Sequence, residues 1–244
     1  MMLRRAIRRA ANTVGFDIHR TSKPLFPVQM AVPPLLQEHL DGAVLYADRT
    51  KALEAVPRGG VVAEIGVALG DFSEAMLAHL APRRFDAFDL FKMHEAESFW
   101  GRSSVNWFGG LSHRAHYERR FADEIAAGKL HIHEGDSSLE MEKQPDSTYD
   151  VIYIDGDHSY EGVIRDANVS ARKLKSNGTL IFNDYIIFDH VLGVPYGVVP
   201  VVHEFCVNCG WQVLFLALQN HLFCDIALRR KAYRQEAFRP PPNR

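Results

Sequence analysis

The chain has 244 residues, 47% of them apolar and 24% charged, the composition of an ordinary globular domain that can bury a substantial core. Its formal net charge of -2 argues against bulk binding to nucleic acid. Three cysteines provide no disulfide framework, and no apolar run approaches the roughly 20 residues that cross a bilayer, so we expect no transmembrane segment and a reducing, cytoplasmic location.

The first 34 residues are predicted to form an arm outside the globular domain. Met1 to Val14 has apolar residues at helical spacing beside four arginines, which predicts a short amphipathic helix with a basic face. This helix is either solvated or a contact in a homodimer, and an anionic membrane or glycan is the alternative partner. Thr21 to Pro34 has four prolines and is typical of an extended arm, whereas Leu35 to about Leu53 is expected to be helical.

A glycine turn follows the first predicted strand of the domain. The segment from Gly59 to about Leu80 is predicted to form a buried strand, a glycine turn and a helix. The turn lacks the G-x-G-x-x-G spacing that holds a pyrophosphate, which counts against NAD or FAD and favours an adenosyl ligand without phosphates. The next strand, Phe85 to Phe88, ends in Asp89, where dinucleotide folds place an acidic residue that accepts hydrogen bonds from ribose.

Residues 98–117 interrupt the alternation of strands and helices. They include two tryptophans and two histidines, and long segments of this kind usually carry a functional site, so we expect a substrate lid. A helix packed on the sheet is the alternative. The strand that follows, Lys129 to His133, leads into Glu134-Gly-Asp-Ser137, a turn that can hold the edge of an adenine.

The most specific pattern is a pair of strand ends with oxygen-bearing side chains. Val151 to Ile154 leads into Asp155, the segment from Ser159 to Lys175 has helical character, and Thr179 to Phe182 leads into Asn183 and Asp184. In such a βαβ unit both carboxyl ends lie at the same edge of the sheet, so these three side chains should converge. Their hard oxygen atoms suit Mg²⁺ better than zinc, whereas simple turn formation is the competing explanation.

The C-terminal part predicts the end of the domain. Trp211 to Leu216 and His221 to Leu228 are typical of a β-hairpin that closes the sheet, and residues 229–244 are expected to form a tail. Cys206 and Cys209 have the spacing of a redox motif, but a structural zinc site needs four ligands and only Cys224 remains as a thiol. We therefore expect no metal or redox role for the cysteines.

Together these motifs resemble the class I S-adenosylmethionine-dependent methyltransferases, through E-I-G-V-A-L-G-D at 64–71, Asp89 and G-D-S at 135–137. More narrowly, D-G-D-H at 155–158 with N-D at 183–184 is similar to the metal-dependent O-methyltransferases, which include catechol, caffeoyl-CoA and macrolide-sugar enzymes. The resemblance covers residues 35–228. It implies a Rossmann-like α/β fold with a mostly parallel seven-stranded sheet, a C-terminal antiparallel hairpin and helices on both faces.

The resemblance also implies roles for individual residues. The metal ligands would be Asp155, Asn183 and Asp184, although the pair at 183–184 reads Asn-Asp where catechol-type enzymes have Asp-Asn and macrolide-sugar enzymes Glu-Asp. His158 matches the general base of the sugar-modifying members. Asp157 is either a solvent-facing turn residue or the residue that orients His158, and it is the alternative base. The residues expected at the S-adenosylmethionine site are Glu64, Gly66, Gly70, Asp71, Ser73, Asp89, Asp136 and Ser137.

We therefore expect a Mg²⁺-dependent O-methyltransferase. Its acceptor is predicted to be a sugar hydroxyl on a small molecule or oligosaccharide, because the D-x-x-H pattern resembles the sugar-modifying branch and the insert carries tryptophans. A catechol or other phenol is the alternative acceptor. A nucleoside-binding module without catalysis is the alternative from a different class.

Overall fold

The computed structural model describes residues 32–191, 193–220 and 222–231. The predicted N-terminal helix and nearly all of the extended arm lie outside the described residues, as does the predicted tail from residue 232. The first two residues of that predicted tail belong to the sheet, because its last strand ends at Arg230.

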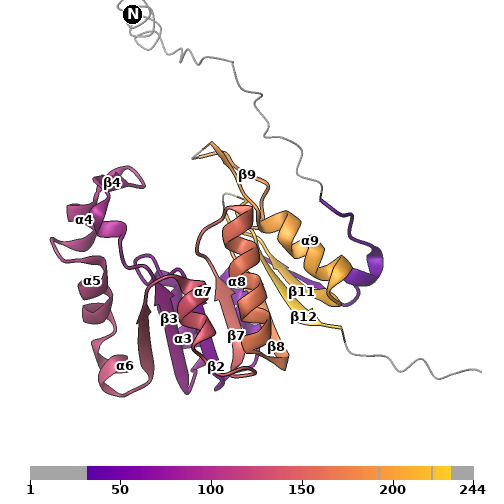
Figure 1. The fold of residues 1–244 in the computed structure, drawn as a ribbon, viewed down its shortest axis with the longest axis horizontal. Helices are drawn as coiled ribbons and strands as arrows, with labels where there is room; N and C mark the ends of the chain where they lie inside the picture. The colour runs from indigo at the N-terminus through magenta and orange to yellow at the C-terminus, as the bar shows by residue number, and fades with distance from the viewer. Residues whose placement is uncertain (1–31, 192, 221, 232–244) are drawn as a thin grey trace, which may run out of the picture. The chain divides into compact units, whose positions relative to one another are not determined.

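The centre of the domain is a sheet of eight strands among the described residues, in the order β1-β11-β12-β8-β7-β2-β3-β6 (Figure 1). Its strands are β1 (Val44–Tyr46), β2 (Val61–Ile65), β3 (Arg84–Asp89), β6 (Leu130–Glu134), β7 (Tyr149–Ile154), β8 (Leu174–Phe182), β11 (Trp211–Ala217) and β12 (Asp225–Arg230). The five strands from β8 to β6 run parallel, β1 is parallel to β11, and β12 is antiparallel to both of its neighbours. The prediction of a mostly parallel Rossmann-like sheet is confirmed.

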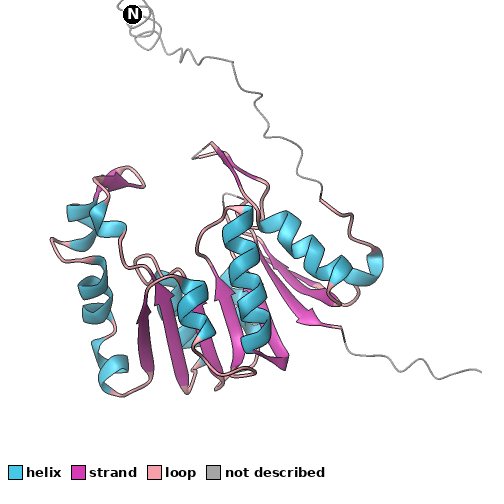
Figure 2. Ribbon diagram, in the orientation of Figure 1, coloured by secondary structure: helices cyan, strands magenta, loops and turns pink. Residues whose placement is uncertain are grey.

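Helices cover both faces of this sheet (Figures 1 and 2). They are α2 (Arg49–Ala52), α3 (Asp71–Leu80), α4 (Ser104–Phe108), α5 (His113–Arg120), α6 (Ala122–Ala126), α7 (Ser137–Glu142), α8 (Tyr160–Lys173) and α9 (Val198–Asn208), with 3-10 turns η1 (Gln37–His39), η2 (Leu53–Ala55) and η3 (Met93–Glu95). None of the helices within the described ranges is long and apolar enough to cross a membrane.

The core is divided between the two faces because side chains alternate along each strand. In β2, Val61, Ala63 and Ile65 belong to one apolar cluster, which includes residues of α7, α8 and α9. Val62 belongs to a second cluster, which includes residues of η2, α3 and α5. All five residues of β2 are buried, as expected for a central strand covered on both faces.

The stretch from Leu35 to Leu53, predicted as one helix, is broken in the structure. It contains η1, then a turn at Gly42 with φ of 77°, then β1 and α2. Glycine adopts this left-handed conformation at little cost, and Val44 to Tyr46 then pairs with β11. The sheet consequently has eight strands within the described residues rather than the predicted seven.

The insert at residues 98–117 contains a small hairpin and two helices, and its role as a substrate lid stays a prediction. A hairpin of β4 (Ser98–Phe99) and β5 (Arg102–Ser103) presents Trp100 with 61% of its surface exposed. Helix α5 instead packs inward, and its His113 and Tyr117 are fully buried. A second small hairpin, β9 (Phe188–Asp189) with β10 (Val194–Pro195), follows β8.

The parallel strands bring the predicted functional turns to one edge of the sheet. The amide of Asp155 donates to the carbonyl of Ile65 at 2.7 Å, and the amide of Asn183 donates to the carbonyl of Ile154 at 2.9 Å. These bonds join the ends of β2, β7 and β8. The glycine turn and the predicted metal ligands are therefore neighbours in space.

Candidate functional site

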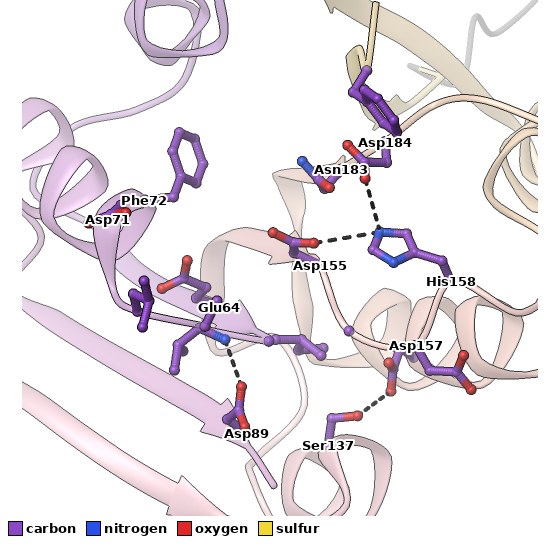
Figure 3. Close-up of a pocket in the computed structure, with 18 of the residues that line it drawn as sticks. Glu64, Asp71, Phe72, Asp89, Ser137, Asp155, Asp157, His158, Asn183 and Asp184 are labelled. Carbon is purple, nitrogen blue, oxygen red and sulfur yellow. Dashed lines mark hydrogen bonds and ion pairs between the residues drawn. The ribbon is translucent and has the colours of Figure 1, made fainter. Parts of the chain in front are cut away.

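A pocket of about 1260 Å³ lies at this carboxyl edge of the sheet (Figure 3). Its wall is formed by the turns after β2, β3, β6, β7 and β8, together with Arg49 from α2, Trp100 from the insert and Tyr196 before α9. Both the predicted cofactor residues and the predicted metal ligands are represented on this wall. One cavity could thus hold a methyl donor and its acceptor side by side.

The turn after β2 requires glycine at its first position. Gly66 has φ of 80°, and a Cβ atom there would lie 2.0 Å from the backbone oxygen of Asp155. A larger residue would push the cofactor turn away from the end of β7. The turn is held on its other side by Asp89, whose Oδ2 accepts from the amide of Val67 at 2.9 Å and whose Oδ1 accepts from the amide of Phe91 at 2.6 Å.

Glu64, the fourth residue of β2, is a buried carboxyl group on the pocket wall. The hydroxyl of Ser73 donates to it, and the hydroxyl of Tyr117 donates to Ser73 at 3.0 Å. Burial raises the pKa of Glu64 to about 8, and the neighbouring charge of Asp89 acts in the same direction, while the hydrogen bond from Ser73 opposes them. Glu64 is thus mainly protonated at neutral pH, and a cationic ligand would favour its ionised form.

The turn after β6 forms the far end of the cofactor side. Asp136 caps helix α7, since its Oδ1 accepts from the amide of Leu139 at 3.1 Å and from the hydroxyl of Ser138 at 2.6 Å. The hydroxyl of Ser137 donates to Oδ1 of Asp166 at 2.7 Å. Burial raises the pKa of Asp166 to about 6.

Six of the eight predicted cofactor residues line the pocket, namely Glu64, Gly66, Asp71, Asp89, Asp136 and Ser137. The structure does not place Gly70 and Ser73 on its wall. Gly70 precedes α3 with φ of 86°, which is a turn requirement, and Ser73 is fully buried as the donor to Glu64. Both act behind the pocket and not on its surface.

The part of the pocket where the acceptor is expected is centred on His158 and two carboxylates, and it is called the acceptor side below. Nε2 of His158 lies 3.5 Å from Oδ1 of Asp155 and 3.9 Å from Oδ2 of Asp184 (Figure 3). Burial raises the pKa of Asp155 well above its usual range, and the charges of Asp184 and Asp225 add to this. Burial raises the pKa of Asp184 to about 6. Two acidic groups therefore share one small, poorly solvated space.

His158 is held in place by an aromatic neighbour. Its ring stacks on Tyr196 with centroids 4.5 Å apart, and the hydroxyl of Tyr196 donates to Asp189 at 2.9 Å. Nε2 of His158 is buried and has no hydrogen-bond partner among the described residues. Burial lowers the pKa of His158, although its interaction with Asn183 and the charges of Asp157 and Asp189 act in the opposite direction.

Asn183 is fixed by a buried polar network. Its Nδ2 donates to the hydroxyl of Tyr153 at 3.0 Å and to Oδ1 of Asp225 at 3.1 Å. Asp225 also accepts from Tyr153 at 3.0 Å and from Gln219 at 2.6 Å. Because the amide nitrogen of Asn183 is occupied, its Oδ1 is the atom that remains to act as a ligand.

Asp157 points toward its own helix. Its carboxylate accepts from the amide of Ser159 at 2.9 Å and from the hydroxyl of Ser159 at 2.8 Å, which is the local turn that precedes a helix cap. Ser159 in turn caps α8 by accepting from the amide of Gly162. This arrangement favours a turn role for Asp157 over a role as an alternative base.

The predicted metal ligands comprise two carboxylates and one amide. Within the described ranges, no group of three or more His, Cys, Asp or Glu side chains is placed to hold a metal ion. Magnesium at Asp155, Asn183 and Asp184 accordingly stays a prediction.

Comparison with known families decides the identity of the domain. A family model described as a methyltransferase domain matches residues 63–185, half of the 244 residues. The chain belongs to this methyltransferase family. The matched region contains the turn after β2, Asp89 and the ends of β7 and β8, so the domain is of the class I S-adenosylmethionine-dependent methyltransferase type, as the resemblance implied.

Solved structures similar to this methyltransferase are distant from it. Spermidine synthase from Thermotoga maritima is 13% identical over 80% of this chain and 59% of its own, with a TM-score of 0.48. The B. subtilis M1A22 tRNA methyltransferase TrmK is 12% identical over 75% of this chain and 66% of its own, with a TM-score of 0.46. The pyocyanin biosynthetic protein PhzM is 14% identical over 71% of this chain and 51% of its own, with a TM-score of 0.48. At TM-scores below 0.5 these similarities carry no argument about activity. No curated protein matches the sequence.

Several residues of the methyltransferase site were not predicted from the sequence. Asp225 carries a usable signal, since an acidic residue at the start of an apolar strand is uncommon and usually needs a buried partner. Arg49 and Tyr196 have no such signal in the sequence, because they lie outside the recognised motifs and reach the pocket only through the fold. His113 lies within the predicted lid but serves the cofactor side.

Proposed function

We propose that this methyltransferase is Mg²⁺-dependent and transfers the methyl group of S-adenosylmethionine to a sugar hydroxyl, with His158 as general base. The observation that carries the proposal is the position of His158 Nε2, which is buried within 4 Å of both Asp155 and Asp184. An imidazole beside two strand-end carboxylates offers a proton acceptor next to an oxygen-rich cation site.

The donor set of the proposed metal site fits Mg²⁺. Asp155 and Asp184 are partly buried and both have a raised pKa, and a divalent cation would remove the cost of keeping them ionised. Asn183 adds an amide oxygen whose orientation is set by Asp225 and Tyr153. A bound Mg²⁺ would lower the pKa of the acceptor hydroxyl.

His158 would take the proton that the acceptor releases. Its stacking on Tyr196 fixes the ring, and its lowered pKa keeps it neutral and able to accept a proton at neutral pH. In the methyl-transfer step, the acceptor oxygen bonds to the methyl carbon while the methyl–sulfur bond breaks. The proton passes to Nε2, and S-adenosylhomocysteine leaves with the electron pair of the broken bond.

The rim of the pocket supports a sugar acceptor. Trp100 lines the pocket, is 61% exposed, and adopts φ of 47°, an uncommon conformation for a bulky residue. Its ring centroid lies 5.2 Å from that of Phe99 and 6.0 Å from that of Trp107, and these edge-on contacts help to fix its orientation. A flat aromatic face beside polar groups suits the C–H surface and hydroxyls of a saccharide.

The test is a methyl-transfer screen with labelled S-adenosylmethionine. Mono- and oligosaccharides are compared with catechols, with Mg²⁺ and after exhaustive chelation. We expect Mg²⁺-dependent methylation of a saccharide, with binding of S-adenosylhomocysteine unaffected by chelation. Turnover that persists fully after chelation would exclude the metal mechanism, and methylation confined to catechols would replace the sugar by a phenolic acceptor.

A further inference from the structure

Helix α5 contacts the turn after β2 in two places and the first turn of α3 in a third. Nε2 of His113 lies 2.5 Å from the carbonyl oxygen of Ala68, and Nη1 of Arg120 donates to the carbonyl of Leu69 at 2.8 Å. The hydroxyl of Tyr117 reaches the first turn of α3 through its bond to Ser73. This helix therefore braces the cofactor turn from outside the pocket.

His113 occupies the most enclosed of these positions. Its side chain is fully buried between the rings of Phe91 and Phe108, with centroid distances of 5.0 and 5.1 Å, and it is not part of the pocket wall. A carbonyl oxygen can only accept a hydrogen bond, so the short contact to Ala68 places a proton on Nε2. Ala68 itself has φ of 45°, a conformation that a non-glycine residue keeps only when its surroundings hold it.

The other nitrogen of the same ring faces the ribose-binding carboxylate. Nδ1 lies 3.8 Å from Oδ1 of Asp89, and it is buried without a hydrogen-bond partner among the described residues. Oδ2 of Asp89 meanwhile accepts from the amide of Val67, the residue before Ala68. One imidazole thus stands beside both groups that define the nucleoside end of the pocket.

We propose that His113 is a positioning residue for S-adenosylmethionine, which fixes the turn at Ala68 against Asp89 so that the ribose site is formed before the ligand arrives. The inference depends on binding of S-adenosylmethionine and not on the metal, the base or the acceptor. A preformed site binds more tightly because ordering the turn no longer opposes binding.

The experiment measures the Kd of S-adenosylhomocysteine by titration calorimetry for the full chain and three variants. His113→Phe keeps a planar ring but removes both nitrogens, and we expect roughly tenfold weaker binding, the effect of losing one buried hydrogen bond. His113→Gln can place a donor near the position of Nε2 and should recover most of the affinity. His79→Gln is the matched control, because His79 also bonds a backbone carbonyl but is exposed at the far end of α3.

A second arm separates positioning from general stability. The same titrations are repeated with an analogue of S-adenosylhomocysteine that lacks both ribose hydroxyls. The wild type should lose affinity for this analogue, and His113→Phe should lose less, because the turn that donates to Asp89 through the amide of Val67 is no longer held in place. If His113→Phe does not fold, His113→Asn takes its place, since its shorter amide cannot reach Ala68. A wild-type Kd in a folded variant, or an equal loss on hydroxyl removal in both proteins, would overturn the proposal.

Discussion

The two ends of the pocket differ in how fully the protein satisfies its own polar groups. At the cofactor end, both oxygens of Asp89 accept from backbone amides, and Glu64 accepts from Ser73. At the acceptor end, Nε2 of His158 has no hydrogen-bond partner within the described part of the chain, and Asp184 has the left-handed φ of 50°. On the pocket wall the polar groups of the cofactor end are thus satisfied, whereas the acceptor end keeps an unsatisfied nitrogen; the unpaired Nδ1 of His113 lies behind the cofactor end and not on the wall.

This difference indicates where ligand binding can contribute most. Buried polar groups without partners destabilise the free protein, and a ligand that satisfies them gains affinity from that relief. Asp155 and Asp184 share their space with the buried Asp225, and the guanidinium of Arg49 is the cation that favours their ionised forms. Binding of a divalent cation there should therefore affect activity strongly and cofactor affinity little.

The largest effect is expected when a proposed metal ligand is removed. Asp155→Ala and Asp184→Ala should each reduce methyl transfer at limiting Mg²⁺ by about 10³-fold or more, the scale of the charge stabilisation that a catalytic metal supplies. Single-turnover transfer measures this effect, and thermal melting checks that the variants fold. Glu54→Ala is the control, because Glu54 pairs with Lys51 at the surface and is not part of the pocket wall. Wild-type rates in either ligand variant would contradict the assignment.

The second largest effect on methyl transfer is expected when the proposed base is removed. His158→Ala should retain the wild-type Kd for S-adenosylhomocysteine and for Mn²⁺ as a Mg²⁺ probe, yet transfer about 10²- to 10⁴-fold more slowly, the usual contribution of general-base catalysis. Rapid-quench assays with the identified acceptor measure the rate. His131→Ala, on the exposed side of β6, serves as the histidine control. A near-normal rate in His158→Ala would leave activation by the metal alone as the explanation.

A smaller effect is expected when Asp225, which orients a proposed metal ligand without being one, is replaced. Asp225→Asn replaces the carboxylate that holds the amide of Asn183, so the Asn183 oxygen should lose its fixed direction. Groups that orient a metal ligand contribute about 10- to 100-fold to metal affinity. We expect that loss for Mn²⁺ binding, with the Kd of S-adenosylhomocysteine unchanged. Equal loss of both affinities would mean that Asp225 supports the whole pocket and that the two ends are not independent.

Much of the fold and the strand-end pattern could be predicted from the sequence. The runs that end at Ile154 and Phe182 are apolar and rich in β-branched or aromatic residues, and the acidic or amide residues that follow them have few alternative locations. Parallel pairing then brings Asp155 and Asn183 to one edge, as expected. Local patterns are reliable here because the side-chain period and the strand order agree.

The contacts made by the insert and by the sheet edge could not be predicted in this way. Val44 to Tyr46 is too short to show a strand period, and its pairing with β11 depends on residues 171 positions further along the chain. His113 has no local signal, since its partners Ala68 and Asp89 are brought to it by the packing of α5. Tyr196 lies in a short segment near proline and glycine and reaches His158 only after β9 and β10 have formed.

The smallest expected effect is the release of a proton from Glu64 when S-adenosylmethionine binds. Glu64 has a pKa of about 8 in the free protein because it is buried, so at pH 7 it is mainly protonated. The ammonium and sulfonium groups of S-adenosylmethionine are cations, and their arrival in the same pocket should lower the pKa of Glu64. Binding at pH 7 should then release a proton, and affinity should rise with pH, by up to about tenfold per unit, until the pH passes about 8.

Calorimetry in two buffers with different ionisation enthalpies measures this release directly. Glu64→Gln removes the titrating group but keeps a polar side chain near Ser73, so the proton release assigned to Glu64 should vanish, and any release that remains comes from other groups of the pocket, such as Asp155 and Asp166, whose pKa values are also raised. The difference between the two proteins isolates the carboxyl group. Equal proton release by wild type and Glu64→Gln would show that Glu64 does not change its protonation state on binding, and it would contradict the coupling between the cationic ligand and this carboxyl group.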